Sequence, residues 1–135
     1  MSETPPPPPP STPQTPAPLP DAEAFSQARL THLVNGFFPL FGGLIFWLIY
    51  KDRSEFMDDQ GKEATNFGIA VFAGFVVLNI VFFIIGIIIP AIFLISWIVF
   101  LALWAFSIYS GFQAGNRAGT GERFRYSILP FRAIK

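Results

Sequence analysis

The chain has 135 residues, of which 52% are hydrophobic and only 13% are charged, and its formal net charge is zero. Soluble domains carry about 25% charged residues. The apolar residues are also clustered, because residues 64–116 contain no Asp, Glu, Lys or Arg. This composition excludes an ordinary water-soluble domain and predicts an all-α membrane protein.

The same composition restricts the chemistry that the chain can perform. It has no cysteine and one histidine, so disulfides, thiolate catalysis and clusters of Cys or His around a metal are excluded. All nine acidic residues lie outside the apolar stretches, whereas a proton or cation relay normally places an ionisable group inside the membrane. We therefore expect no enzyme activity, no catalytic residue, no cofactor, no metal site and no nucleic-acid partner.

Residues 1–20 form a separate region that holds ten of the thirteen prolines. Proline lacks an amide hydrogen and fixes φ, so this region predicts a disordered, proline-rich arm of polyproline-II character. We interpret the arm as a spacer. The alternative is a PxxP ligand for an SH3-like partner, although the nearest basic flanking residue is Arg29.

The membrane domain is expected over residues 21–135, and its first span over residues 30–50. Asp21 is a candidate cap for the helix that leads into this span. Pro39 removes a backbone hydrogen bond and predicts a kink near Gly36. His32 is interpreted as a polar cap at the membrane edge, and Trp47 as part of an interfacial aromatic belt.

The charged residues 51–63 are predicted to form a loop, with Asp58 or Asp59 capping the next helix. A single helix over the uncharged residues 64–116 would be about 80 Å long, nearly three bilayers. We therefore expect two spans, over residues 64–85 and 91–112, with a break at residues 86–90. A basic tail over residues 113–135 follows.

The distribution of Lys and Arg predicts the orientation. Three spans place Arg29 on one side of the membrane and the other eight basic residues on the other side. The basic side is expected to be cytoplasmic, so the arm should lie outside and the tail inside. A two-span arrangement with a re-entrant first segment is the less favoured alternative, because we expect it to separate the tail from the charged loop.

Polar and small residues inside the predicted spans allow two interpretations. The polar ones are Asn35, Asn79, Ser96, Ser107 and Ser110. They could line a pore, but hydrogen bonding between helices is the favoured interpretation. Ser107, Gly111 and Gly115 recur every four residues and allow close helix packing, either within the chain or in a homo-oligomer.

Several short motifs resemble those of the Tic-twenty-like family of small bacterial membrane proteins. His32–Leu33 precedes a proline-containing span, and the sequences QGKEATNF (residues 60–67) and FRYSI (residues 124–128) are similar to the family forms HGKEALNF and YRYPL. Gln60, Thr65, Phe124 and Ser127 depart from those forms. The resemblance covers about residues 28–135.

The resemblance implies a multi-pass protein of the bacterial inner membrane, and it directs attention to the loop motif and the tail. The candidate interaction or structural residues are Lys62, Glu63, Asn66, Arg123, Arg125, Tyr126 and Arg132. We expect Glu63 to pair with Arg123 or Arg125. The arginines of the tail also suit an anionic lipid surface.

The predicted function is that of a non-enzymatic membrane protein that acts through helix packing and through contacts with lipids, a membrane-protein partner or a second copy. The alternative is a subunit of a transport or protein-translocation channel.

Overall fold

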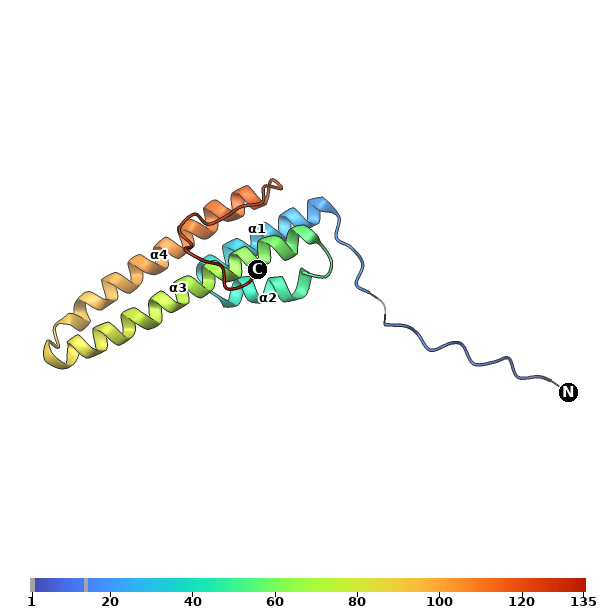
Figure 1. The fold of residues 1–135 in the computed structure, drawn as a ribbon, viewed down its shortest axis with the longest axis horizontal. Helices are drawn as coiled ribbons and strands as arrows, with labels where there is room; N and C mark the ends of the chain where they lie inside the picture. The colour runs from blue at the N-terminus through green and yellow to red at the C-terminus, as the bar shows by residue number, and fades with distance from the viewer. Residues whose placement is uncertain (1, 14) are drawn as a thin grey trace.

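The computed structural model describes residues 2–13 and 15–135, and over these residues the chain forms four helices and no strand. The helices are α1 (Asp21–Phe37), α2 (Phe41–Tyr50), α3 (Glu55–Ile88) and α4 (Ile92–Ala118). Figure 1 shows that α3 and α4 form a long hairpin, with α1 and α2 packed against only one end of it. The described residues before Asp21 form no helix; residues 17–19 contact Arg53 just beyond the end of α2, and the earlier ones extend away from the helical body.

The predicted single span over residues 30–50 is wrong, because α1 and α2 are two antiparallel helices. Helix α1 ends at Phe37, and the chain reverses through Pro39, which has no amide hydrogen, and Leu40, whose φ is 75°. The Leu19 amide donates to the Arg53 carbonyl at 2.9 Å, so the start of α1 lies beside the end of α2. With ten residues, α2 is about 15 Å long, half the thickness of a hydrocarbon core, so it is too short to cross a membrane. The two helices form a short antiparallel hairpin.

Asn35 joins this hairpin to α3. Its Nδ2 donates to the Ala64 carbonyl at 2.7 Å, and its Oδ1 accepts from the Gly43 amide at 2.9 Å. Glycine is needed at the contact, because a Cβ on Gly42 would lie 2.5 Å from the Asn35 backbone nitrogen. The predicted hydrogen bonding between helices is confirmed for Asn35, which is fully buried.

Helix α3 begins earlier than predicted, so the charged loop is limited to residues 51–54. Ser54 is the N-cap, and its Oγ accepts from the Met57 amide at 3.2 Å. The proposed caps Asp58 and Asp59 lie inside the helix instead. The chain does break around Pro90, but later than predicted: α3 continues through Gly86 to Ile88 and α4 starts at Ile92, so the break covers residues 89–91 instead of 86–90.

The small residues of α4 pack against α1 within the same chain. The Ser107 Oγ donates to the Gly36 carbonyl at 2.9 Å, and a Cβ on Gly111 would lie 2.6 Å from the His32 carbonyl oxygen. The favoured hydrogen-bonding interpretation is therefore also confirmed for Ser107. The same ridge extends to Gly115, which faces the Arg29 carbonyl.

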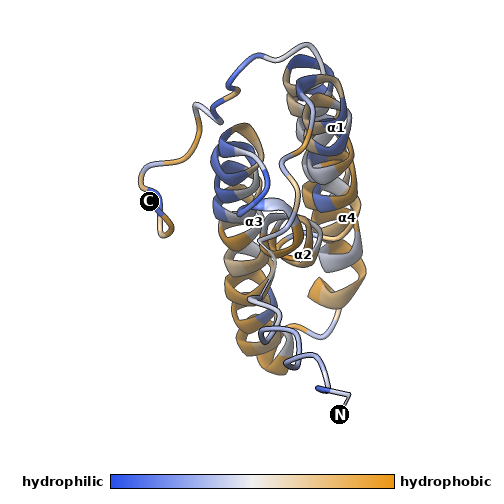
Figure 2. Cartoon of the chain, turned by 90° about the vertical axis from the view of Figure 1, so that its right-hand side faces the viewer, coloured by the Kyte–Doolittle hydropathy of each residue, from blue (hydrophilic) through white to orange (hydrophobic). Residues whose placement is uncertain are grey.

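Helices α3 and α4 are each long and apolar enough to cross a membrane. In each helix, only 11% of the most apolar 18-residue stretch is buried. Figure 2 shows hydrophobic residues along most of their length and hydrophilic residues at the end where α3 begins. The core helices of a soluble protein would be buried instead. The fold is thus that of a membrane protein with two long candidate spans, and the third predicted span is replaced by the short hairpin.

The arm, the loop and the tail lie at one end of the molecule. The α1–α2 hairpin returns to the end where it starts, and α3 and α4 together leave and return to that same end. The expected separation of the arm from the tail is therefore wrong for this fold. The objection to a re-entrant segment was also wrong, because the tail stays beside the loop: Arg123 reaches Glu55 at 3.0 Å.

Candidate functional site

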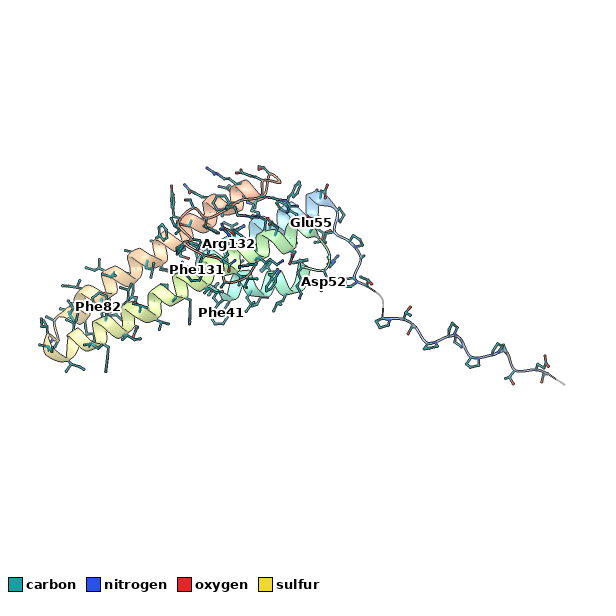
Figure 3. All side chains as sticks on the ribbon, in the orientation of Figure 1. Phe41, Asp52, Glu55, Phe82, Phe131 and Arg132 are labelled. Atoms are coloured by element: carbon teal, nitrogen blue, oxygen red, sulfur yellow. The ribbon has the colours of Figure 1, made fainter. Side chains whose placement is uncertain are left out.

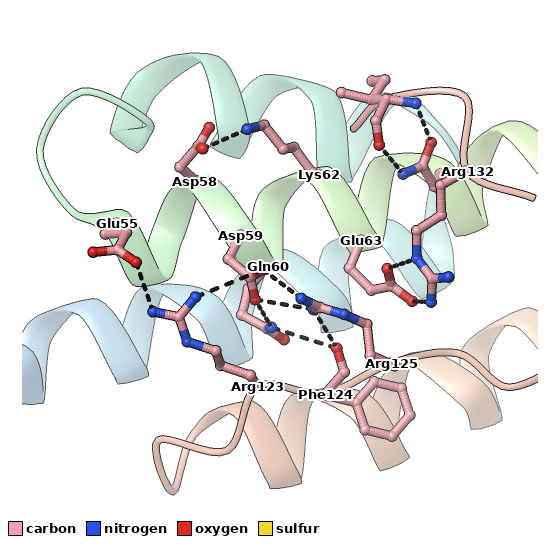
Figure 4. Close-up of polar contacts among 12 residues, drawn as sticks. Glu55, Asp58, Asp59, Gln60, Lys62, Glu63, Arg123, Phe124, Arg125 and Arg132 are labelled. Carbon is pink, nitrogen blue, oxygen red and sulfur yellow. Dashed lines mark hydrogen bonds and ion pairs between the residues drawn. The ribbon is translucent and has the colours of Figure 1, made fainter.

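After α4 the tail folds back along the first three turns of α3 and is held there by a ladder of ion pairs (Figure 4). Glu55, Asp59 and Glu63 are spaced four residues apart and share one face of α3. Arg123 pairs with Glu55 at 3.0 Å, Arg125 donates to Asp59 at 2.9 Å, and Arg132 pairs with Glu63 at 2.7 Å. We call this surface, residues 55–66 and 123–134, the tail junction.

Glu63 is the most buried carboxylate of the tail junction, with 2% of its side chain exposed. It accepts hydrogen bonds from the Tyr126 amide at 2.7 Å and from Nε and Nη2 of Arg132 at 2.7 and 2.9 Å. The predicted pairing of Glu63 with Arg123 or Arg125 is wrong. The tail runs in the same direction as α3, so its first two arginines meet the carboxylates of the first two turns.

Asn66 closes the far end of the tail junction. Its Nδ2 donates to the Ile134 carbonyl at 2.8 Å, and its Oδ1 accepts from the Ile134 amide at 2.8 Å. Lys62 is the one predicted residue that does not hold the tail, because its Nζ pairs with Asp58 within α3. The other six predicted residues are brought together by the ladder and by Asn66.

His32 is fully buried beneath the tail junction, so its predicted role as a polar cap at the membrane edge is wrong. Its Nδ1 lies 3.0 Å from the Tyr126 hydroxyl, and its Nε2 lies 3.1 Å from Gln60 Oε1. Gln60 Nε2 then donates to Asp59 Oδ2 at 2.8 Å. One buried chain of hydrogen bonds therefore links α1, α3 and the tail.

The protonation states of this chain follow from burial. Burial lowers the pKa of His32 to about 4, against the opposing effects of the Gln60 hydrogen bond and the Glu63 charge, so the ring is neutral near pH 7. Burial, together with the Glu63 charge, raises the pKa of Tyr126, which keeps its hydroxyl protonated. Tyr126 therefore donates to Nδ1 of His32, and the ring carries its hydrogen on Nε2, which donates to Gln60.

Asp59 carries a charge that the tail stabilises. Burial favours its neutral form, but hydrogen bonds from Arg125 and Gln60 outweigh burial and hold the pKa of Asp59 below its usual range. Aromatic packing adds to the attachment of the tail, since Tyr126 stacks on Phe67 of α3 with ring centroids 4.0 Å apart. The arrangement acts as a clamp that fixes the tail on α3.

The prediction from the sequence missed Glu55, Asp59, Gln60 and His32 as members of the site. A signal for the first two was present in the sequence, because Glu55, Asp59 and Glu63 recur every four residues. His32 and Gln60 belonged to the quoted motifs, but their contact joins residues 28 positions apart. No local pattern reports such a contact.

Comparison with known proteins identifies the family. Residues 24–134, which include all but the first turn of α1, the other three helices and nearly all of the tail, match the family model described as the magnetosome magnetite crystal formation protein family (MamF/MmsF). No curated protein and no solved structure matches the chain. The assignment to the Tic-twenty-like family is therefore wrong, because the residues that carry the quoted motifs match the MamF/MmsF family model instead. The chain belongs to the magnetosome magnetite crystal formation protein family.

Proposed function

We propose that this protein is a small multi-pass protein of the magnetosome membrane that acts in magnetite crystal formation without catalysis, through contacts of the α3–α4 hairpin with the same hairpin of a second copy. The family description supports the process and the membrane. It replaces the bacterial inner membrane that the incorrect resemblance implied.

The part of the hairpin that projects beyond α1 and α2 supports contacts with other helices. Its apolar side chains face outward: 57% of Val77, 77% of Leu94 and 71% of Trp97 are exposed. Figure 3 shows side chains along this projecting part, with Phe82 labelled near its far end. Contact with lipid alone would account for the exposure of these apolar side chains. A polar residue among them is therefore a better indication of a contact with another protein.

Asn79 is that polar residue, and it carries the proposal. It is exposed, and by the helical rise it lies about 24 Å along α3 from Glu63, at hydrocarbon depth. Among the described residues its amide has no hydrogen-bond partner. It lines a cavity of about 410 Å³ with Ser96, Trp97 and five phenylalanines. An unpaired amide in hydrocarbon is costly, and a partner helix removes that cost by hydrogen bonding to it.

The charged residues of α3 support a structural role for this helix rather than a catalytic one. Its first three turns carry four carboxylates, and each one pairs with a cation of the same chain: Glu55, Asp58, Asp59 and Glu63. The pairs of Glu55, Asp59 and Glu63 hold the tail, and the pair of Asp58 with Lys62 stabilises the start of α3 itself. The carboxylates are therefore used in folding the tail junction.

The arrangement of the ends supports two spans with both termini on one side. All nine Lys and Arg residues belong to α1, the loop, the start of α3, the last turn of α4 and the tail. The turn around Pro90 carries none. By the positive-inside rule we infer that this end faces the cytoplasm. Reporter fusions at residues 1 and 135 should then report the same side, and opposite sides would contradict this topology.

Cross-linking in magnetosome membranes tests the association, and the absence of cysteine from the chain makes single-cysteine variants unambiguous. Phe83 is 62% exposed and lines the same cavity as Asn79, so Phe83→Cys should form a disulfide with a second copy. Adding Asn79→Leu should abolish the cross-link, and adding Asn79→Gln, which keeps an amide, should retain it. The control Ile49→Cys lies on α2 and is 56% exposed, and it should not cross-link.

Two results would contradict the proposal. Equal cross-linking of the Phe83 and Ile49 variants, unaffected by Asn79→Leu, would show collision instead of association through the hairpin. Recovery of the protein in other membranes but not in the magnetite-containing fraction would refute the location.

A further inference from the structure

We propose that α3 and the docked tail form a binding site for one anionic phospholipid. The lipid phosphate binds in a polar cavity beside Lys62, Arg132 and Lys135, and an acyl chain lies in the apolar cavity next to it. This site is separate from the cavity around Asn79, and it does not depend on the association proposed above.

The polar cavity has a volume of about 90 Å³ and lies between α3 and the end of the tail. Four cationic side chains and two carboxylates line it: Lys62, Arg125, Arg132, Lys135, Asp59 and Glu63. Arg125 and Arg132 pair with the two carboxylates, and Lys62 pairs with Asp58 beside the cavity, so Lys135 adds positive charge beyond these pairs and the cavity favours an anion. Its small volume suits a phosphate group and is too small to hold part of a protein or nucleic acid.

Donors remain available in this cavity after the ion pairs of the tail junction are formed. Arg132 uses Nε and Nη2 on Glu63, and a guanidinium carries five N–H donors. Within the described part of the chain, Nη1 of Arg132 and Nζ of Lys135 make no hydrogen bond. The Arg132 side chain is 38% exposed, so a ligand can reach it from the membrane surface. An anion would thus add to the ladder without breaking it.

The apolar cavity has a volume of about 250 Å³ and lies under the last part of the tail. Ile69, Ala70 and Ala73 of α3 form one wall. Four tail residues form the other wall: Leu129, Pro130, Phe131 and Ala133. Asn66 lines both cavities, so the polar one opens directly beside the apolar one.

The order of polar and apolar groups matches that of a phospholipid. Helix α3 changes from charged to uncharged between Glu63 and Ala64, which is where the two cavities meet. Phe131 is 72% exposed and Ile128 is 57% exposed, as expected for tail residues that lie in the headgroup boundary. Figure 3 shows Phe131 and Arg132 together beside α3. Charge complementarity and this position select a lipid anion as the occupant.

Native mass spectrometry of the full chain in micelles tests the site with three probes: phosphatidylglycerol, phosphatidylcholine and inorganic phosphate. Phosphatidylglycerol should bind in preference to phosphatidylcholine. The variant K62Q/K135Q removes two cations that do not hold the tail, and it should weaken phosphatidylglycerol binding about thirtyfold, or about fivefold for each charge. The matched control K51Q/R117Q removes two charges at the same end but outside both cavities, and it should leave binding within twofold.

A second variant tests the apolar cavity. Ala73→Trp fills it and should weaken the binding of both lipids. Hydrogen exchange of the Tyr126 and Ile134 amides shows whether the tail stays docked in each variant, so a loss of binding in a docked variant is a loss of the site.

Three results would overturn the proposal. Equal losses in K62Q/K135Q and K51Q/R117Q would show general surface attraction. Equal affinity for the two lipids would show that charge does not select the occupant. Displacement of phosphatidylglycerol by millimolar inorganic phosphate, with no effect of Ala73→Trp, would identify a site for a soluble anion.

Discussion

Replacing Glu63 by Gln is expected to release the tail from α3 while leaving the helices folded. The Glu63 side chain is 2% exposed and receives three hydrogen bonds, two of them from the charged Arg132. Gln has the same shape and can still accept from the Tyr126 amide. That oxygen can also accept from Nη2 of Arg132, but the NH₂ group would face Nε of Arg132, so one hydrogen bond and the ion pair are lost.

The size of the effect follows from the exposure of the two partners. A hydrogen bond to a charged group contributes about 1.5–3 kcal/mol, and breaking a fully buried pair costs about 3–5 kcal/mol. Arg132 is 38% exposed, so water hydrates its guanidinium after the pair is lost. We therefore expect Glu63→Gln to lower the free energy of tail docking by about 2 kcal/mol, which raises the equilibrium constant for local opening about thirtyfold.

Hydrogen exchange at single amides measures this opening. The Tyr126 and Ile134 amides are bonded to Glu63 and Asn66, so both should exchange about thirtyfold faster in Glu63→Gln, while amides in the centre of α4 should be unchanged. The matched control is Glu122→Gln in the same tail, since Glu122 is exposed and forms no ion pair with the described residues. Unchanged exchange at Tyr126 in Glu63→Gln, or equal acceleration in Glu122→Gln, would refute the role of Glu63.

Four further outcomes are expected. A double-mutant cycle should give a coupling energy of about 1–2 kcal/mol for Glu63 with Arg132 and a smaller one for Glu63 with Arg125, which bonds Asp59 instead; the reverse order would contradict the ladder. Gly68→Ala should destabilise the fold by about 1–3 kcal/mol, because the new Cβ would overlap the Leu40 backbone. In the control Gly74→Ala the new Cβ would contact only Leu103, at 3.6 Å, so this variant should have nearly the melting temperature of the unchanged protein. Leu40→Gly should raise the free energy of unfolding by about 1 kcal/mol, because glycine adopts the positive φ of this position without strain. The control Leu44→Gly, inside α2, should lower it. A lower stability of both variants would show that the Leu40 side chain matters more than its backbone. The folded-state pKa of His32, about 4, lies below its ordinary value of 6.5, so the unfolded chain takes up the proton first as the pH falls. The free energy of unfolding should therefore decrease between pH 6.5 and 4, by at most about 1.4 kcal/mol per pH unit. In His32→Gln the free energy of unfolding should stay constant from about pH 6.5 to about pH 5, and an equal slope in that variant would assign the dependence to another group.

Acid should also loosen the tail, and the sign follows from the lowered pKa of Asp59. Its stabilising charge is complete above the ordinary value of 3.8 and is lost as the pH falls through the lower folded-state value. Protection of the tail against proteolysis should therefore decrease below about pH 4, and Asp59→Asn should show the same loss at neutral pH. A fully protected Asp59→Asn tail would contradict this.

The amino-acid sequence by itself determined that the protein is a helical membrane protein, and it located the turn between the long helices. An uncharged stretch of residues 64–116 is too long for one span, and Pro90, near the middle of that stretch, disfavours a continuous helix there. Both conclusions depend on local chemistry, namely the transfer of side chains into hydrocarbon and the missing amide of proline. The sequence also pointed to Glu63, Asn66 and Arg132, which the structure brings together.

Only the tertiary structure decided the path of residues 30–50 and the pairing in the tail junction. A proline inside an apolar stretch permits either a kinked span or a reversal, and the reversal is selected by the Asn35 bonds to Gly43 and to the Ala64 carbonyl on α3. Likewise, each arginine of the tail could pair with any carboxylate of α3, and the direction in which the tail runs chooses among them. Apart from the bond between Asn35 and Gly43, these choices depend on contacts between residues about 30 to 70 positions apart, which no local pattern in the sequence encodes.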